Sequence, residues 1–377
     1  MELRIAFIHT ALAFYRVQLF NVLSKHYNVE FFFHKIYGNV SENPKFKHRM
    51  LRGIPIPGIS DYQLPPALIY HLINGRFNVL IAAGAAQLDT MVAFLVSRLL
   101  RIPFILWDVE WFYNSSVLSM LRYPFWRHIV LSSDALVLPG TKSKQFHMAV
   151  GVPDEKIFLS PNTSELESVG LEPESLRVSL GLDAKDKIIL CFTRISPEKG
   201  LEYLLDAYKS LKHVHVKLII ATTLPPNEDY LQVLIAQAEA TGDDGIIIKV
   251  FKNSQKAQLF SMCDIFVLPS ITHPITGPEV WGMALNEALS AGKPLIASTS
   301  VGGAHDMIVQ GKNGYIVRES DSRMLGEALQ KLLDSPILKE MGEYSKALHS
   351  DRFRLAHEVQ GFDDAISYTL KTRINFV

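Results

Sequence analysis

The chain has 377 residues, with 38 Lys and Arg against 38 Asp and Glu and 48% apolar residues. This length suggests two or three domains, and the composition is that of a globular protein, which excludes a disordered chain. Two cysteines cannot form a disulfide framework or a cysteine-based metal site. No uncharged apolar run reaches the roughly 18 residues of a membrane-spanning helix, and the first residues, MELRIAFIHT, resemble a strand rather than a signal peptide. We therefore expect a cytoplasmic protein.

Strand-like apolar runs alternate with helix-like runs in the first part of the chain. Strands are expected at Leu3–His9, Val29–Phe33, Val79–Ala83, Phe104–Trp107 and Ala135–Leu138, and helices at Arg16–Lys25, Thr90–Arg101 and Lys142–Val150. This alternation is typical of a parallel sheet that is covered on both faces.

The alternation pauses at Pro161–Lys187, whose Pro, Gly, Asn and Glu content indicates a connection between domains. It resumes with strands at Ile188–Phe192, Val214–Ala221, Ile246–Val250, Ile265–Leu268 and Pro294–Ser298, with helices at Gly200–Leu211, Tyr230–Thr241, Ser254–Cys263 and Trp281–Ala291, and with a helical tail. We predict an α/β protein of two doubly wound, Rossmann-like domains facing a central cleft, with ligands beyond the carboxyl ends of the strands.

Two cations lie in the loop after the strand Ile188–Phe192. Arg194 offers a planar fork of donors and Lys199 a point charge, and both suit a diphosphate. The backbone amides of the helix that begins near Gly200 would add partial positive charge. The alternative is that both are solvated loop cations.

Two carboxylates, Glu279 and Glu287, are separated by eight positions across a predicted helix start. That spacing would let one bond hydroxyls at the helix mouth and the other bond hydroxyls about two turns along. Gly282, between them, would let a phosphate approach the backbone amides. A small-residue loop, Ser298–Ala304, follows the next strand. The alternative is that Glu279 only complements the helix dipole and Glu287 is exposed.

In combination these features resemble the donor-binding domain of glycosyltransferase family 4, strongly over residues 185–320. The resemblance rests on an ordered set of motifs: Arg194-x4-Lys199, Pro269-Ser270, Glu279-x7-Glu287, Gly292-Lys293-Pro294, Gly302-Gly303 and Gly311–Tyr315. It implies the two-domain GT-B fold, a nucleotide-sugar donor, retention of anomeric configuration, and no metal or other cofactor. The implied domains are an acceptor-binding domain at 1–165, a donor-binding domain at 166–350, and a helix at 351–377 that returns to the first domain.

The resemblance also implies roles for individual residues. Arg194 and Lys199 would hold the diphosphate, Glu279 the sugar hydroxyls and Glu287 the ribose. The backbone of Val280, Trp281, Gly282 and Met283 would line the sugar and phosphate, and that of Phe251, Lys252 and Asn253 would meet the base. Consistent with metal independence, the sequence has no Asp-x-Asp pair and no His/Asp cluster with metal-ligand spacing.

The first half departs from the family pattern in two places. The loop after the first strand, His9–Arg16, has no glycine, and the segment Leu106–Trp111 lacks the His that many members carry there. Asp108 or Glu110 would take over hydrogen bonding near the sugar, or would only cap a turn and face solvent. Arg16 would meet a phosphate on the acceptor, or would be an ordinary helix-face residue.

The first 150 residues are basic, with 15 Lys and Arg against 8 Asp and Glu, and they carry aromatic residues among the bases. This pattern suits peripheral contact with an anionic membrane at its inner face, an acceptor cleft for a polar glycan, or an aromatic core. Nucleic acid is disfavoured because no recognised binding module accompanies the bases. The groups concerned are Trp111–Tyr113, Leu118–His128, Lys45, Lys47, His48, Arg49 and Arg52.

The leading hypothesis is a retaining transferase that moves a hexose or N-acetylhexosamine from a UDP- or GDP-sugar to a glycan, lipid-linked or small-molecule acceptor. A nucleotide-sugar 2-epimerase-like isomerase and a nucleotide-sugar-binding protein without turnover are the alternatives.

Overall fold

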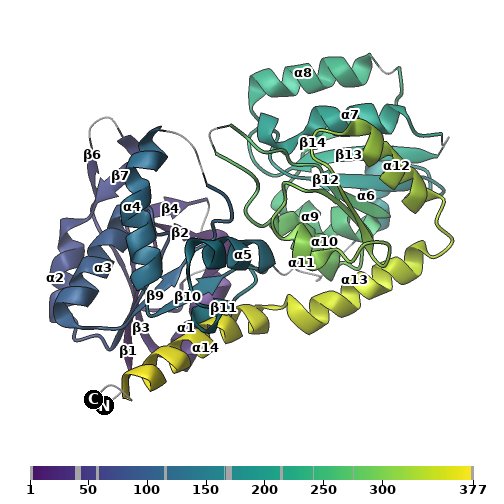
Figure 1. Ribbon diagram of the computed structural model, residues 1–377. Coiled ribbons are helices and arrows are strands. Elements are labelled where there is room, and N and C mark those ends of the chain that lie inside the picture. Colours follow the sequence, from purple (N-terminus) through teal and green to yellow (C-terminus); the bar gives the residue numbers. More distant parts are fainter. Residues whose placement is uncertain are drawn as a thin grey trace. The chain divides into compact units, whose positions relative to one another are not determined.

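The computed structural model describes residues 3–38, 44–56, 59–113, 117–164, 166, 172–212, 215–240, 242–274 and 276–374. The chain divides into two compact units, residues 1–161 with 355–377 and residues 162–354. Each unit is built on a parallel sheet, as predicted from the alternation of strands and helices (Figure 1).

The first unit contains a seven-stranded parallel sheet with strand order β11-β10-β9-β8-β1-β3-β5. A parallel pair, β2 and β4, and an antiparallel pair, β6 and β7, complete its strands. The strands are β1 (Arg4–Ile8), β2 (Ala11–Ala13), β3 (Asn28–Phe33), β4 (Lys35–Tyr37), β5 (His48–Met50), β6 (Ile54–Ile56), β7 (Ile59–Leu64), β8 (Val79–Ala83), β9 (Phe104–Trp107), β10 (Ala135–Leu138) and β11 (Ile157–Leu159).

Helices cover both faces of this sheet. One face packs against α2, α3, α4 and α5, and the other against α1 and α14. Phe362 of α14 lies 5.7 Å from Phe7 and 5.3 Å from Trp107, measured between ring centroids, so the last helix completes the core of the first unit. The helices are η1 (Phe14–Arg16), α1 (Val17–His26), α2 (Pro66–Asn74), α3 (Leu88–Leu100), α4 (Val117–Ser132), α5 (Thr141–Val150), η2 (Asp154–Lys156) and α14 (Leu355–Ile374).

The second unit contains a six-stranded parallel sheet with strand order β14-β13-β12-β15-β16-β17. In β12, Ile188, Leu190 and Phe192 face one core cluster while Ile189 and Cys191 face the other. Because both faces are buried, the strand is continuously apolar. The strands are β12 (Lys187–Phe192), β13 (Val216–Thr222), β14 (Ile246–Val250), β15 (Ile265–Leu268), β16 (Leu295–Ser298) and β17 (Gly314–Val317).

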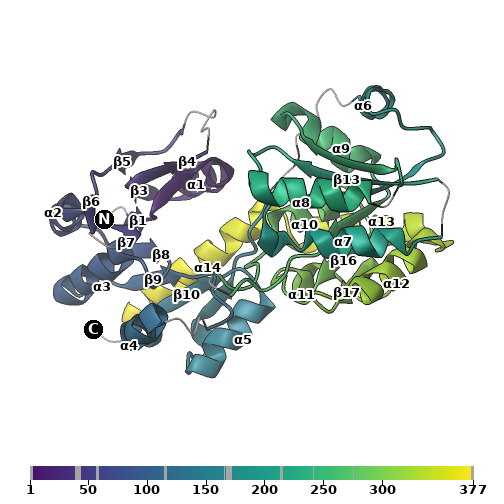
Figure 2. The same cartoon turned by 90° about the horizontal axis from the view of Figure 1, so that it is seen from above.

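Helices again lie on both faces. The cluster on one face contains α6, α9, α10 and α11, and that on the other contains α7, α8 and α12 (Figure 1). Figure 2 looks onto the second of these faces, with α7 and α8 in front. The helices are α6 (Pro173–Ser179), η3 (Pro197–Lys199), α7 (Leu201–Lys209), α8 (Glu228–Glu239), η4 (Asn253–Gln255), α9 (Lys256–Met262), α10 (Met283–Ser290), α11 (Ala304–Met307), α12 (Ser322–Leu333) and α13 (Leu338–Arg352).

Two details differ from the sequence-based expectations. The predicted connection Pro161–Lys187 contains helix α6, which begins at Pro173, where the fixed φ of proline favours a first helical turn. The helix predicted at Trp281–Ala291 begins at Met283, because Gly282 has a φ of +87° that no helix accommodates.

The unit boundaries lie four residues from the predicted ones, at 161 rather than 165 and at 354 rather than 350. Contacts around one indole ring account for this. The Nε1 of Trp281 donates to the Asn162 carbonyl at 2.7 Å, and the ring of Trp281 lies 6.3 Å from that of Phe353. Both flanking segments are therefore held by the second unit.

Candidate functional site

Lys199 and Glu279 form an ion pair at the carboxyl edge of the second sheet. Lys199 ends η3, in the loop after β12, and Glu279 lies in the loop after β15. Their Nζ and Oε2 atoms are 3.0 Å apart, and the side chains are only 9% and 18% exposed. The Ser270 hydroxyl also donates to Glu279 Oε2. Two positions that the sequence predicted to act on one ligand are therefore in contact.

The loop that carries the cations is fixed against the loop after β15. The Ile271 amide donates to the Glu198 carbonyl at 3.0 Å. Gly200 has a φ of +60°, and a Cβ at this position would lie 2.4 Å from the Pro269 carbonyl oxygen. A glycine is needed here because the two backbones approach closely. The close approach places Lys199 beside Ser270 and Glu279.

Arg194 lies on the same loop but is more exposed. Its guanidinium pairs with Glu198 at 3.0 Å and is 55% exposed. Burial alone would raise the pKa of Glu198, but the Ser196 hydrogen bond and the charges of Arg194 and Lys199 outweigh it and hold that pKa below its usual value. Both cations thus lower the pKa of one acid on the loop that carries them.

The small-residue loop after β16 pairs with the segment that carries Glu279. The Glu279 amide donates to the Ser300 carbonyl at 2.9 Å, and the Gly302 amide donates to the Glu279 carbonyl at 2.9 Å. The Gly303 amide in turn donates to the Trp281 carbonyl at 3.0 Å. The loops after β12, β15 and β16 therefore meet at one edge of the sheet.

The segment Val280–Met283 is held largely by packing. Trp281 is buried with its indole bonded inside the unit, and Val280 and Met283 pack on the apolar core. A Cβ at Gly282 would lie 2.8 Å from Val301 Cγ1 and 2.9 Å from Leu268 Cδ2. The close contacts with β15 and with the loop after β16 therefore require a glycine at this position, whether or not a phosphate also approaches it.

Glu287 lies on α10 and is 3% exposed, so it is a buried acid and not an exposed helix residue. Its Oε1 accepts from Lys256 Nζ at 2.5 Å and from the Ser164 hydroxyl at 2.6 Å. The Lys256 ammonium also lies 5.2 Å from the centroid of Phe192, the last residue of β12. The second acid is therefore also at the carboxyl edge, next to the end of β12.

Lys256 also connects Glu287 to the segment expected to meet the base. It begins α9 directly after η4, which starts at Asn253. Lys252 and Asn253 are exposed, whereas Phe251 is buried and its amide donates to the Thr222 carbonyl at 2.7 Å. The positions predicted for ribose and base binding are thus joined through one ion pair.

The predicted residues of the first unit lie at the carboxyl edge of its own sheet. Asp108 directly follows β9 and is 1% exposed, with Oδ2 3.4 Å from His147 Nε2 and Oδ1 accepting from the Val109 amide at 2.9 Å. Burial, and then the Asp108 charge, raise the pKa of Glu110 to about 8. Both effects favour the neutral form of Glu110, which can donate a hydrogen bond.

Arg16 is engaged inside the first unit. Its NH1 lies 2.6 Å from Glu358 Oε1, and its guanidinium carbon lies 4.6 Å from the centroid of Trp107. This buried ion pair ties η1 to α14. Contact of Arg16 with an acceptor phosphate stays a prediction.

The sequence reasoning missed a buried polar cluster beside β1, β3 and β8. His34 Nδ1 lies 3.4 Å from Asp89 Oδ2, to which the Thr10 hydroxyl donates at 3.2 Å. Burial raises the pKa of Asp89 to about 6, and burial followed by the Arg16 charge lowers that of His9 to about 3. The available signal was that His9 ends a predicted strand, His34 directly follows one, and Asp89 directly precedes a predicted helix.

Two of the basic residues that the sequence singled out in the first unit form ion pairs within that unit. Lys47 and Arg49 both pair with Glu30, at 2.7 and 2.5 Å. The side chains of Leu118, Ser119 and Leu121 lie outside the described residues.

Within the described ranges, no helix is both long and apolar enough to cross a bilayer. In the same part of the chain, no group of three or more His, Cys, Asp and Glu side chains could hold a metal ion.

Comparisons with known proteins agree with this architecture. Residues 173–348 match the family described as "Glycosyl transferases group 1". Over 261 residues, the chain is 24% identical to lipopolysaccharide 1,2-N-acetylglucosaminetransferase of Salmonella typhimurium, covering 67% of this chain and 66% of that protein. Over 216 residues, it is 31% identical to spore coat protein SA of Bacillus subtilis, covering 55% and 54%. The chain thus spans less than two thirds of the length of these curated relatives.

A solved structure covers nearly the whole chain. HepE of Anabaena, in complex with UDP and glucose, superimposes with a TM-score of 0.76 at 18% identity, over 97% of this chain and 99% of that one. This likeness shows the fold, which is the GT-B fold expected from the motifs. The family match at residues 173–348, in the second unit, agrees with the resemblance to glycosyltransferase family 4.

Proposed function

We propose that the chain is a glycosyltransferase that moves a hexose or N-acetylhexosamine from a nucleotide-sugar donor to a glycan, lipid-linked or small-molecule acceptor, with retention and without a metal. The observation that carries the proposal is the Lys199–Glu279 ion pair, with Arg194 on the same loop, at the carboxyl edge of the second sheet. This is the edge at which doubly wound sheets bind ligands.

The cations suit a departing diphosphate. The leaving nucleoside diphosphate gains negative charge as the glycosidic bond loosens, and fixed donors stabilise that charge without reorganisation. Because an ammonium group has three donors and a guanidinium has five, each has donors beyond the one it gives to Glu279 or Glu198. These charges would take the part that a divalent cation plays in other transferases.

The two acids suit hydroxyl groups. We assign Glu279 to the sugar hydroxyls and Glu287 to the ribose. The contacts of the Glu287 carboxylate with Ser164 and Lys256 are both made by Oε1, so within the described residues Oε2 can accept from a ribose hydroxyl. The family match and the relatives' names support glycosyltransferase activity. HepE, which shares the fold, has been solved with UDP-glucose, so a UDP-sugar is the first donor to test.

The proposal is tested by incubating the full chain with UDP- and GDP-sugars, with and without a panel of glycan and lipid-linked acceptors, in the presence of EDTA. We expect nucleoside diphosphate release that needs an acceptor and survives EDTA, with an α-linked product from an α-linked donor. Conversion of the donor sugar without an acceptor would instead assign an isomerase. Nucleotide-sugar binding without turnover on any acceptor would assign a binding protein.

A further inference from the structure

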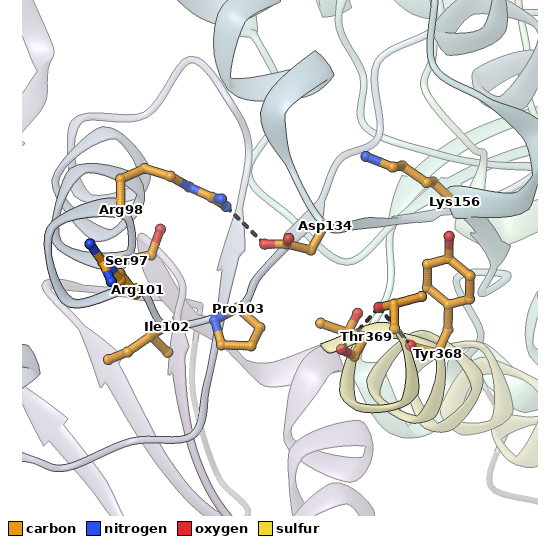
Figure 3. Close-up of a pocket in the computed structure, with 10 residues that line it drawn as sticks. Ser97, Arg98, Arg101, Ile102, Pro103, Asp134, Lys156, Tyr368 and Thr369 are labelled. Carbon is orange, nitrogen blue, oxygen red and sulfur yellow. Dashed lines mark hydrogen bonds and ion pairs between the residues drawn. The ribbon is translucent and has the colours of Figure 1, made fainter. Parts of the chain in front are cut away.

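A groove of about 470 Å³ lies in the first unit, at the opposite edge of its sheet from Asp108 and Glu110. Pro103 and Asp134 line it, and they directly precede β9 and β10. The groove therefore opens at the amino-terminal edge of the sheet, between the end of α3 and the face of α14 (Figure 3). Its volume is that of a site for a small molecule, and none of the roles proposed above uses it.

The charged groups of the groove are mostly cationic. Arg98, Arg101 and Lys156 line it together with a single acid, Asp134. Figure 3 shows the charged ends of Arg98 and Lys156 directed toward the side of the groove where Asp134 lies. The three cations exceed the acid by two charges, which favours an anionic ligand.

The hydrogen-bonding groups show the same preference. Asp134 Oδ2 already accepts from Arg98 NH2 at 2.8 Å and from the Phe104 amide at 2.8 Å. Lys156 gives one donor to the Ser133 carbonyl at 3.3 Å, and the hydroxyls of Thr369 and Thr372 donate to carbonyls of their own helix. The hydrogen-bonding groups that remain for a ligand are mainly donors, namely further N–H groups of Arg98 and Lys156, and the Tyr368 hydroxyl. Such a site favours a ligand whose groups accept hydrogen bonds and do not donate them.

Arg101 supplies the third cation from an unusual backbone position. It ends α3 with a φ of +55°, a left-handed conformation that usually selects glycine. Among the described residues, no acid lies within ion-pair distance of its guanidinium. Ile102, Pro103 and the ring of Tyr368 add apolar surface beside these charges.

From this arrangement we propose that the groove binds a phosphate-bearing ligand, with Arg98 and Lys156 holding the phosphate, Arg101 adding positive charge to the wall of the groove, and the apolar wall contacting the group attached to the phosphate. The ligand is either a soluble phosphate compound or the headgroup of an anionic lipid. The shared chemistry is a phosphate dianion or diester facing three cations.

The test compares Arg101→Ala and Lys156→Ala with a matched control, Arg76→Ala. Arg76 also follows a helix, α2, also has a positive φ of 50°, is exposed and does not line the groove. It therefore controls for net charge, for relief of backbone strain and for the helix dipole. Calorimetry with pyrophosphate measures soluble binding. Flotation with phosphatidylglycerol vesicles, against phosphatidylcholine alone, measures lipid binding.

We expect each groove variant to weaken one of these interactions about tenfold, while Arg76→Ala matches the natural chain. Arg194→Ala is included so that pyrophosphate bound at the loop after β12 is recognised and subtracted. Weaker pyrophosphate binding by the groove variants in calorimetry identifies a soluble phosphate ligand. Weaker binding of these variants to phosphatidylglycerol vesicles in flotation identifies a lipid headgroup. If neither readout separates the two groove variants from Arg76→Ala, the proposal is wrong.

Discussion

Replacing Arg194 by alanine should abolish most catalysis without a comparable loss of stability. The chain offers a matched control in Arg323, which also pairs with a Glu four residues later. The Arg194–Glu198 and Arg323–Glu327 distances are 3.0 and 2.8 Å, and the two arginine side chains are 55% and 76% exposed. Exposed pairs of this kind contribute about 0–1 kcal/mol. In a unit of this size that corresponds to a shift in melting temperature of at most about 4 °C.

The catalytic effect should differ sharply between the two variants. Loss of one donor aimed at a developing negative charge costs about 3–4 kcal/mol of barrier, or a factor of roughly 10²–10³ in rate. The assay is the initial rate of nucleoside diphosphate release at donor concentrations below KM, which reports kcat/KM. Arg194→Ala should lose about two to three orders of magnitude, and Arg323→Ala should retain the natural rate. Equal rates for the two variants would refute the assignment of Arg194 to the diphosphate.

Three further predictions concern stability and pH. Gly282→Ala should destabilise the second unit by about 2 kcal/mol or more in urea unfolding, because its Cβ would overlap two apolar side chains; Gly311→Ala has the same backbone strain without the overlap and should cost less. The pKa of Asp89 is raised from 3.8 to about 6 in the folded chain. Asp89 therefore stabilises the fold fully at a pH below its pKa in the unfolded chain, and this stabilisation is lost as the pH rises through its pKa in the folded chain. The free energy of unfolding of Asp89→Asn, relative to that of the natural chain, should therefore increase by up to about 3 kcal/mol as the pH rises from about 4 to about 7. A difference in stability that does not change with pH would contradict this. If neutral Glu110 donates a hydrogen bond to the sugar, donor KM should rise as the pH passes its pKa of about 8; Glu110→Gln, which remains a neutral donor, should lack this rise, and identical pH profiles would count against that role.

The fold could be predicted largely because the sheets are buried on both faces. Runs such as Val79–Ala83, Phe104–Trp107 and Ile265–Leu268 are strands with the predicted bounds, since a continuous apolar run between polar segments has few other solutions. Helix α6 was missed because its Pro and Glu content is also that of a linker. The short strands β2 and β4 have three residues each, which is too few to show a period of two.

The site could be predicted only as a set of positions. The spacing of Arg194 and Lys199 indicated a phosphate loop, but spacing cannot show that Lys199 contacts Glu279, which lies 80 positions later. Likewise Lys256 and Ser164 were not connected to Glu287 before the fold brought them together. In the first unit, the His34–Asp89 pair forms because β3 and β8, the two strands that flank β1, end at the same edge of the sheet. Such partners depend on strand order, which a local pattern does not contain.

The return of α14 to the first unit has a consequence for synthesis on the ribosome. The second unit is one continuous stretch, residues 162–354, and can fold as soon as it has emerged. The first unit cannot, because Phe362 belongs to its core and is translated after the whole of the second unit. Until then, the face that receives α14 stays uncovered, with Phe7 and Trp107 among its apolar residues. The nascent chain should therefore complete its later unit first, and chaperones should act mainly on the earlier one.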